Sequence, residues 1–257
     1  MKAAYRRLVI KLSGGHLAGD HGFGISPTVI AGIADELREV HELGTQLGVV
    51  IGGGNVIRGI TAAAQGLDRA SADYMGMLGS VINALALQDA LEKAGLSTRV
   101  LSALEISSVA ERYIRRRAVR HLEKGRVVVF AGGTGNPYFS TDTAAALRAA
   151  EIGAEIILMA KQGVDGVYSA DPNTHPGATR YSSLSFEEAI QKDLRVMDQT
   201  ALALCRENHL PLIVFDMSVR GNIRRVAAGE VVGTRVGQPE AGGGGKRRKT
   251  ATAKTGE

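Results

Sequence analysis

The chain has 257 residues, a length that allows one large domain or two small ones. Its single cysteine, Cys205, excludes an internal disulfide and a cysteine-based zinc site. The formal net charge is +5, but residues 238–257 hold five Lys/Arg and two Glu, which is +3, so the body carries about +2 (5 − 3). We therefore expect a nearly neutral body without a basic stripe. No signal peptide and no apolar run of about 18 residues is present, which predicts a soluble cytoplasmic protein.

Short β-branched runs alternate with stretches of helical spacing along the chain. This alternation predicts an α/β fold with a largely parallel central sheet sandwiched by helices. The predicted strands are Leu8–Leu12, Val49–Ile51, Thr98–Leu101, Arg126–Phe130, Ile156–Met159 and Leu212–Phe215. The predicted helices are Val29–Leu43 (after Ser26 as N-cap and Pro27), Ser71–Ala94, Glu105–Leu122, Asp142–Ala150, Phe186–Lys192, Asp198–Asn208 and Gly221–Ala228.

We expect residues 1–237 to form a single domain. The Gly-, Lys- and Thr-rich stretch 238–257 is typical of a disordered basic tail. A solvated tail explains this composition better than a nucleic-acid-binding arm does.

The first two strands end in glycine-rich loops. Lys11 stands inside an apolar strand just before Ser13-Gly14-Gly15, where it either projects toward a ligand or is a snorkelling edge residue. Gly52-Gly53-Gly54 follows the next strand and can bring backbone close to a phosphate, although a tight turn is an equally simple interpretation. Ligands bind at the carboxyl ends of strands in such sheets, so both loops are candidates.

Two other candidates are ambiguous by themselves. Asp73 near a helix start either accepts hydrogen bonds from sugar hydroxyls or only complements the helix dipole. The stretch 164–172, VDGVYSADP, contains turn signals and a tyrosine that could cover a purine ring, but a plain hairpin also explains it.

The most informative stretch is 132–145, GGTGNPYFSTDTAA. A strand, a glycine turn and a helix start present backbone N–H groups to an anion, and Asp142 adds a carboxylate there. The side chains of residues 136–139 add more chemistry than a turn needs and indicate a small polar ligand. Together, loops at several strand ends suit phosphoryl transfer, which depends on positioning and charge neutralisation. The histidines show no zinc-like spacing, and the sequence identifies no metal ligands.

In this order, the motifs resemble those of the bacterial uridylate (UMP) kinases of the amino acid kinase superfamily. The matching segments are KLSG at 11–14, GFGI at 22–25, VVIGGGN at 49–55, MGML at 75–78, GTGNPYFSTD at 133–142, VDGVYSADP at 164–172 and VMD at 196–198. The resemblance covers about residues 6–236. The resemblance implies an amino acid kinase-like fold and the reaction ATP + UMP → ADP + UDP with Mg²⁺, in pyrimidine nucleotide biosynthesis.

The resemblance also implies roles for individual residues. Lys11 and Asp142 would be catalytic. ATP would contact Lys11, Leu12, Ser13, Gly14, Gly54, Arg58, Gln162, Tyr168 and Asp171. UMP would contact Gly53, Asp73, Thr134, Gly135, Asn136, Pro137, Tyr138, Phe139, Ser140 and Thr141.

Regulation and assembly are implied in the same way. Relatives are homohexamers, often activated by GTP and inhibited by UTP. The candidate residues for GTP are Gly19, Asp20, His21, Gly22, Phe23, Gly24, Arg99 and Arg126. Nothing implies a membrane or a nucleic-acid partner. One departure is Gly15, which replaces the acid of the common KLSGE motif.

Two alternatives remain open from the sequence. A kinase of the same superfamily acting on a carboxylate or carbamate would keep the donor loops, but it would not need the aromatic pair Tyr138-Phe139. A non-catalytic nucleotide sensor, or a nucleic-acid-binding regulator that uses the basic tail, would not need Lys11, Arg58 and Asp142.

Overall fold

The computed structural model describes residues 3–57, 66–172, 174–175, 177–194 and 196–237. A nine-stranded sheet runs through them in the order β4-β3-β5-β2-β1-β6-β8-β9-β7. All neighbouring pairs are parallel except β8 with β9. The predicted fold class, an α/β protein with a largely parallel sheet, is confirmed. The basic tail, 238–257, lies outside the described residues.

The strands lie close to their predicted positions, and three short ones (β4, β7 and β9) were not predicted. The strands are β1 (Arg7–Leu12), β2 (Gln46–Ile51), β3 (Thr98–Ser102), β4 (Glu111–Arg112), β5 (Val127–Ala131), β6 (Ile156–Lys161), β7 (Ser183–Leu184), β8 (Leu212–Asp216) and β9 (Thr234–Val236).

Most helices begin at a side chain that caps them. Ser26 caps α2 with Pro27 at the first position, as predicted, while Ser140 caps α6 and Asp198 caps α8. The helices are α1 (Gly14–Leu17), the 3₁₀ turn η1 (Gly19–His21), α2 (Pro27–Glu42), α4 (Arg69–Lys93), α5 (Arg115–Glu123), α6 (Thr141–Ile152), α7 (Phe186–Gln191), α8 (Gln199–Glu207) and α9 (Asn222–Ala227).

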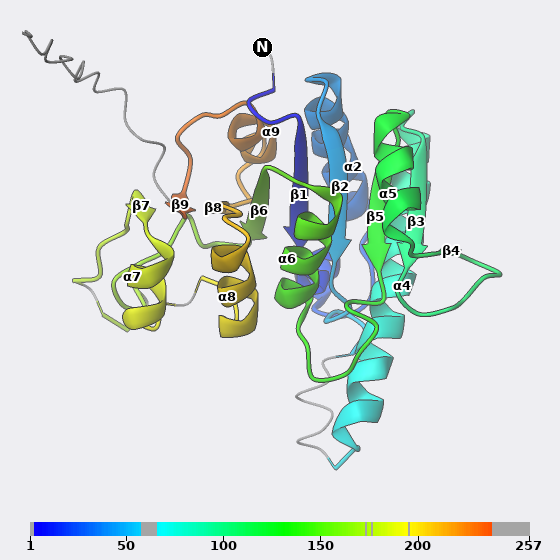
Figure 1. Cartoon of the computed structure of the whole chain (residues 1–257). Coiled ribbons are helices and arrows are strands. Elements are labelled where there is room, and N and C mark those ends of the chain that lie inside the picture. Colours follow the sequence, from blue (N-terminus) through cyan, green and yellow to red (C-terminus); the bar gives the residue numbers. More distant parts are fainter. Residues whose placement is uncertain (1–2, 58–65, 173, 176, 195, 238–257) are drawn as a thin grey trace, which may run out of the picture.

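Helices cover both faces of the sheet (Figure 1). Alternate residues of each central strand enter opposite cores because side chains alternate across a strand. In β1, Ile10 and Leu12 join the core under α2, α4 and α9, whereas Val9 joins the core under α5, α6, α7 and α8. Both faces of the central strands are therefore buried, which leaves the strand ends as the places where polar groups gather.

The prediction of one helix over Glu105–Leu122 is wrong in its first half. Residues 106–110 form a turn, β4 pairs with β3, and α5 begins at Arg115. Tyr113 just before α5 donates its hydroxyl hydrogen to Glu151 of α6 and packs edge-on against Phe130 of β5. These long-range contacts outweigh the local helical spacing.

Within the described part of the chain, no helix is long and apolar enough to cross a membrane.

Candidate functional site

The loops with unusual residues follow four neighbouring strands of the sheet. In the order β5-β2-β1-β6, each strand is parallel to the next, so their carboxyl ends meet at one edge. The loops after these strands begin at Gly132, Gly52, Ser13 and Gln162. The predicted clustering of the glycine loops at this edge therefore follows from the topology.

An ion pair lies at the centre of this edge. Lys11, near the end of β1, places Nζ 2.8 Å from Oδ1 of Asp142, which stands in the first turn of α6. The two side chains are only 13% and 17% exposed. The interpretation of Lys11 as a snorkelling edge residue is therefore wrong, because β1 is the middle strand and Lys11 faces a carboxylate.

A second lysine, Lys161, reaches the same place from the end of β6. Burial lowers the pKa of Lys161, and the positive charge of Lys11 lowers it further, while the negative charge of Asp142 opposes both effects. Two cations and one carboxylate thus meet where three loops converge. Such a group can neutralise the charge of a phosphate that is being transferred.

Glycines are needed at this edge because backbone segments approach each other closely. A Cβ atom on Gly14 would lie 2.5 Å from the carbonyl oxygen of Gly52 and 2.7 Å from the nitrogen of Gly54. A Cβ on Gly53 would lie 2.2 Å from the carbonyl oxygen of Gly76 in α4. Gly53 therefore allows the glycine loop to pack against the backbone of α4, where a Cβ on Gly79 would in turn lie 3.1 Å from the carbonyl oxygen of Gly53.

Two buried amides fix the glycine loop to α4. Asn55 and Asn83 exchange side-chain hydrogen bonds of 3.0 and 2.6 Å, and Asn83 also donates to the carbonyl of Gly52 at 2.7 Å. Asn55 in turn donates to the carbonyl of Gly24 at 2.6 Å. Buried amides are costly unless they are paired, and here each one positions a loop.

A cleft of about 460 Å³ opens beside the ion pair, between the glycine loop, α4 and the start of α6. Its volume is in the range of small-molecule sites. Six of the residues predicted to contact UMP line it: Gly53, Asp73, Tyr138, Phe139, Ser140 and Thr141. Gly54, predicted to contact ATP, lines it as well.

Asp73 connects the two walls of this cleft. Its Oδ2 atom accepts hydrogen bonds from Arg69 Nε and from the backbone N–H of Tyr138, both at 2.8 Å. Tyr138 has a positive φ of 71°, an uncommon conformation for a non-glycine residue, and the guanidinium of Arg69 lies 5.8 Å from its ring centre. Asp73 is therefore more than a partner of the helix dipole, because it holds the loop 132–140 against α4.

The remaining predicted UMP contacts lie earlier in the same loop. Thr134 and Asn136 line a second, more open hollow of about 620 Å³ between α6 and α8, and Phe139 lines both hollows. Gly135 and Pro137 line neither. The loop thus reaches both hollows: Gly133 and residues 138–141 line the cleft, whereas Thr134 and Asn136 line the neighbouring hollow.

The residues predicted to surround the adenosine of ATP lie on the segment after β6. Gln162 and Asp171 are exposed, and Tyr168 donates its hydroxyl hydrogen to Asp165 at 2.7 Å. None of the three lines either hollow. Tyr168 forms an isolated antiparallel bridge with Arg180, so part of the predicted hairpin exists. Arg58, the other predicted ATP contact with a long side chain, lies outside the described residues.

The predicted GTP residues fall at opposite ends of the sheet. Gly19–Gly24 follow the carboxyl end of β1, where the N–H of Gly24 bonds to Asn55. Arg99 and Arg126 lie at the amino ends of β3 and β5. One chain therefore does not bring the two groups together.

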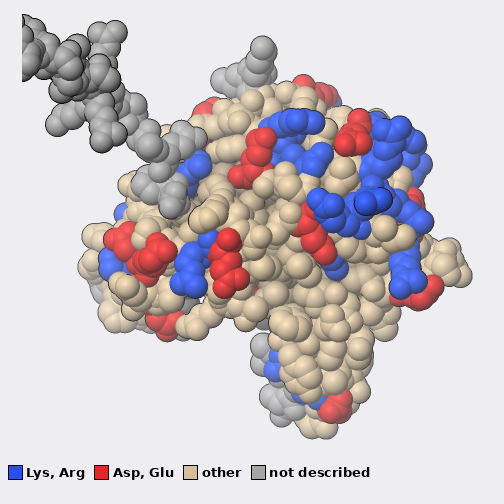
Figure 2. Space-filling model, viewed as in Figure 1, with Lys and Arg blue, Asp and Glu red and all other residues tan. Residues whose placement is uncertain are grey.

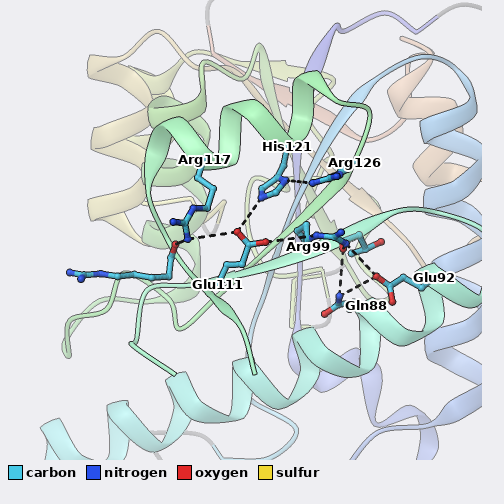
Figure 3. A network of polar contacts seen from close by, with 9 residues as sticks. Gln88, Glu92, Arg99, Glu111, Arg117, His121 and Arg126 are labelled. Atoms are coloured by element: carbon cyan, nitrogen blue, oxygen red, sulfur yellow. Dashed lines mark hydrogen bonds and ion pairs between the residues drawn. The ribbon is translucent and has the colours of Figure 1, made fainter. Parts of the chain in front are cut away.

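Arg99 and Arg126 belong to one polar network (Figure 3). Glu111 lies 3.8 Å from Arg99, 3.7 Å from Arg117 and 3.2 Å from His121, whose Nδ1 lies 3.0 Å from Arg126. Exposed arginines on and beside α5 adjoin this network, and Figure 2 shows Lys and Arg gathered over this helix. The nearly neutral body thus carries a local basic patch on α5, which its total charge did not predict. The exposed arginines are Arg112, Arg115, Arg116, Arg117 and Arg120.

Three residues of the site were not identified from the sequence: Arg69 and Asp198, which line the cleft, and Lys161, which lies near the Lys11–Asp142 pair. Lys161 ends an apolar strand just as Lys11 nearly does, so the same reasoning could have found it. Arg69 and Asp198 stand at helix starts, where polar residues are common. Their roles depend on contacts with Asp73 and Ser140, which no local pattern reveals.

The carboxylates of the site suit a magnesium ion held mainly by phosphates. Among the described residues, no three His, Cys, Asp or Glu side chains are placed to hold a metal together. The buried Oδ1 of Asp142 lies near Lys11 but receives no well-aligned hydrogen bond within the described part of the chain. Because Mg²⁺ usually binds one or two carboxylates together with substrate phosphates, Asp142 fits that requirement.

The site and the sheet define a class of proteins. The amino acid kinase family profile matches residues 6–216, and the chain belongs to this family.

The similar proteins are more specific. The chain is 58% identical to the uridylate kinase of Limosilactobacillus reuteri over 232 residues, which are 90% of this chain and 97% of the relative. It is 59% identical to the uridylate kinase of Pediococcus pentosaceus, over 90% of this chain and 96% of the relative.

Solved structures agree with these relatives. The crystal structure of UMP kinase from Bacillus anthracis matches with a TM-score of 0.88 at 42% identity, covering 91% of this chain and 96% of that one. UMP kinase from Ureaplasma parvum matches with a TM-score of 0.86 at 39% identity, covering 93% and 100%.

Proposed function

We propose that this protein transfers the terminal phosphoryl group of ATP to UMP, forming ADP and UDP for pyrimidine nucleotide biosynthesis. The observation that carries the proposal is the cleft beside the Lys11–Asp142 pair, lined by the loop 138–141 and by Asp73. The relatives named uridylate kinase, which match over nine-tenths of the chain, support the same substrate pair.

The acceptor would lie in this cleft. Asp73 uses Oδ2 for Arg69 and Tyr138, and no described group bonds to its Oδ1, which can accept hydrogen bonds from ribose hydroxyls. The start of α6 would direct the N–H groups of Ser140 and Thr141, which do not bond to the Ser140 hydroxyl, at the UMP phosphate, where a helix N-terminus favours an anion. Tyr138 and Phe139, which are 66% and 52% exposed, would close over the base.

The donor phosphates would lie over the loops after β1 and β2. Lys11 and Lys161 would neutralise the transferred group, and the backbone of Ser13, Gly14 and Gly54 would contact the other phosphates. The UMP phosphate is itself an anionic nucleophile, so no residue has to remove a proton from it. Catalysis then rests on alignment of the two substrates and on charge stabilisation.

Magnesium belongs to this proposal. Asp142 would hold the ion together with phosphate oxygens, and the bound ion would supply charge neutralisation between the phosphates. The ion pair with Lys11 would hold the Asp142 carboxylate in position for the ion.

A direct test incubates the purified full chain with ATP, UMP and MgCl₂ and separates the products by anion-exchange chromatography. We expect equal amounts of ADP and UDP, and no UDP when a chelator replaces the metal. ADP without UDP would indicate hydrolysis or another acceptor and would contradict the proposal.

A kinase of carboxylates or carbamate is the nearest alternative within the family. The donor loops would serve such an enzyme equally well. The exposed aromatic pair at the cleft favours a nucleobase instead, because a planar ring stacks on it and a small carboxylate does not.

We propose that the network around Glu111 receives a guanine nucleotide effector, and that UTP inhibits. In support, the three arginines of this network have few ionisable partners within the described residues. Arg99 pairs with Glu92 and Glu111, Arg117 pairs with Glu111, and Arg126 contacts His121. The negative charges of a triphosphate could therefore take the place of the Glu111 carboxylate. Arg126→Ala should abolish the response to GTP while basal activity stays unchanged, and an unchanged response would contradict this assignment.

We propose self-association through α4, with a homohexamer as the expected assembly. The amino-terminal part of α4 projects beyond the sheet (Figure 1), and Tyr74, Met75, Leu78 and Ile82 are 42–50% exposed along it. An apolar row at helical spacing on one projecting helix suits a second copy of the same helix. Light scattering should give six chains per particle, and Leu78→Glu should reduce that number.

The proposed location is the cytoplasm, where both nucleotide substrates are found.

A further inference from the structure

Asp198, the last residue of the VMD segment, connects two helix starts at the cleft. It caps α8 by accepting a hydrogen bond from the N–H of Ala201 at 2.9 Å. The same carboxylate accepts hydrogen bonds from the hydroxyls of Ser140 and Thr143, with Thr143 Oγ1 at 3.1 Å from both oxygens. Capping alone explains the first bond but not the other two.

The hydroxyl of Ser140 uses its full bonding capacity. Its oxygen accepts from the N–H groups of Asp142 at 2.9 Å and Thr143 at 3.2 Å, which makes it the cap of α6. A hydroxyl has one hydrogen to donate, and here it goes to Asp198. These bonds need an acceptor on both sides of the Asp198 side chain, because Oδ1 accepts from the Ala201 N–H and Oδ2 accepts from the Ser140 hydroxyl.

The chain of bonds ends at the reacting edge. Asp198 fixes Ser140, Ser140 fixes the backbone N–H of Asp142, and Asp142 pairs with Lys11 at 2.8 Å. Asp198 also lines the cleft itself, together with Gln199 and Thr200 at the start of α8. A shift of α6 by a fraction of an ångström would misalign both the anion site and the Lys11–Asp142 pair.

We propose that Asp198 is a positioning residue, which holds the start of α6 in the geometry that phosphoryl transfer requires. The proposal rests on the proposed function for its kinetic consequences, but its structural part concerns the chain alone. Because misplacement of reacting groups by about 1 Å can cost about 100-fold in rate, we expect the effect in kcat rather than in ATP binding.

The test uses Asp198→Asn, which keeps an oxygen for the Ala201 N–H and so keeps the cap of α8. The NH₂ group of the asparagine would take the place of Asp198 Oδ2, and an NH₂ group cannot accept the hydrogen of the Ser140 hydroxyl. We expect kcat to fall roughly 10- to 100-fold with the KM for ATP nearly unchanged. Ser140→Ala should lower kcat by a similar factor, and the double variant by no more than either single one, because both break one chain of bonds.

Two further variants guard against a folding defect. Thr143→Val removes a hydroxyl donor to Asp198 and leaves both helix caps intact, whereas Thr143→Ser keeps that donor. We expect Thr143→Val to lower kcat and Thr143→Ser to preserve it. Ser185→Ala removes the cap of α7, which has no contact with the cleft, and should leave kcat unchanged.

Amide hydrogen exchange gives a readout that does not depend on the substrate. The N–H groups of Asp142 and Thr143 should exchange faster in Asp198→Asn than in the original chain, while those of α7 should not. Unchanged exchange, or a double variant whose losses multiply, would overturn the proposal. If the original chain makes no UDP, the proposed function fails, whereas the exchange result still decides the role of Asp198.

Discussion

The wall of the cleft formed by α4, α6 and α8 differs from the segment after β6 that carries Gln162, Tyr168 and Asp171. In the wall, Asp73 and Asp198 each bridge separate elements through hydrogen bonds to side chains and backbone. The segment after β6 is largely exposed. Its Tyr168 hydroxyl donates to nearby Asp165, and its backbone pairs with residues 179–181 through the bridge between Tyr168 and Arg180. The proposed acceptor side is thus held by contacts between separate helices and loops, whereas the predicted adenosine side is held mainly by contacts within one exposed segment.

This difference indicates where specificity and rate should reside. A preorganised wall loses little entropy on binding, so its contacts should discriminate between acceptors. The largely buried charges between the two sides should determine the rate of transfer; they belong to Lys11, Asp142 and Lys161. The exposed residues after β6 should contribute least to both acceptor specificity and the rate of transfer.

The largest effect on activity is expected from the charged group that lies between the cleft wall and the segment after β6. Lys11→Ala removes the cation paired with Asp142 and should lower kcat by about 10³-fold, the scale of losing a group that stabilises transition-state charge. Steady-state kinetics at saturating ATP and UMP measure it. Lys93→Ala at the exposed end of α4 is the matched control, and a Lys11→Ala enzyme as active as this control would contradict the role of the pair.

A smaller effect is expected in the wall. Asp73→Ala removes the carboxylate that would accept the ribose hydroxyls and that bonds Tyr138, and it should raise the KM for UMP by about 10- to 100-fold. The KM for ATP should stay nearly constant. Asp89→Ala, on the exposed face of the same helix, should change neither constant. A rise in the KM for ATP instead would place the acceptor elsewhere.

The next effect concerns pH. Burial and the charge of Lys11 lower the pKa of Lys161, so in the free enzyme Lys161 loses its proton at a lower pH than an ordinary lysine does. If its charge is needed, kcat/KM for ATP should decrease on the alkaline side. Lys161→Arg keeps the charge and should move this decrease to higher pH, since arginine stays protonated. Profiles that coincide would exclude Lys161 as the titrating group.

The smallest effect is expected after β6. Gln162→Ala changes an exposed side chain that lines neither hollow, and it should change the KM for ATP by less than about threefold. A loss as large as that of Asp73→Ala would show that this segment is as well organised as the wall, and the comparison between the two sides would fail.

Sequence alone predicted the sheet, most helices and the position of the glycine loops, because these depend on short periodic patterns. It could not predict that residues 106–110 leave the helix, since the contacts of Tyr113 with α6 and β5 decide this. The basic patch on α5 was visible as Arg115-Arg116-Arg117 but was hidden in a nearly neutral total.

The candidate site, too, could be predicted only as far as local sequence patterns reveal it. Lys11, Asp142 and the loop 138–141 were found from residue type and order, and the structure gathers them at one edge. Arg69, Lys161 and Asp198 were missed because their importance comes from partners far away in the sequence. Asp198, for example, bonds to Ser140, which is 58 residues away.

The central claim is that the loop 132–142 and α4 select UMP as acceptor. Its most direct test measures kcat/KM for UMP, CMP, dUMP, aspartate and glutamate derivatives side by side, from ADP release with Mg-ATP and the full chain. We predict that UMP exceeds every other acceptor, with dUMP next and the carboxylates inactive. Efficient phosphorylation of CMP or of a carboxylate, without phosphorylation of UMP, would contradict the account.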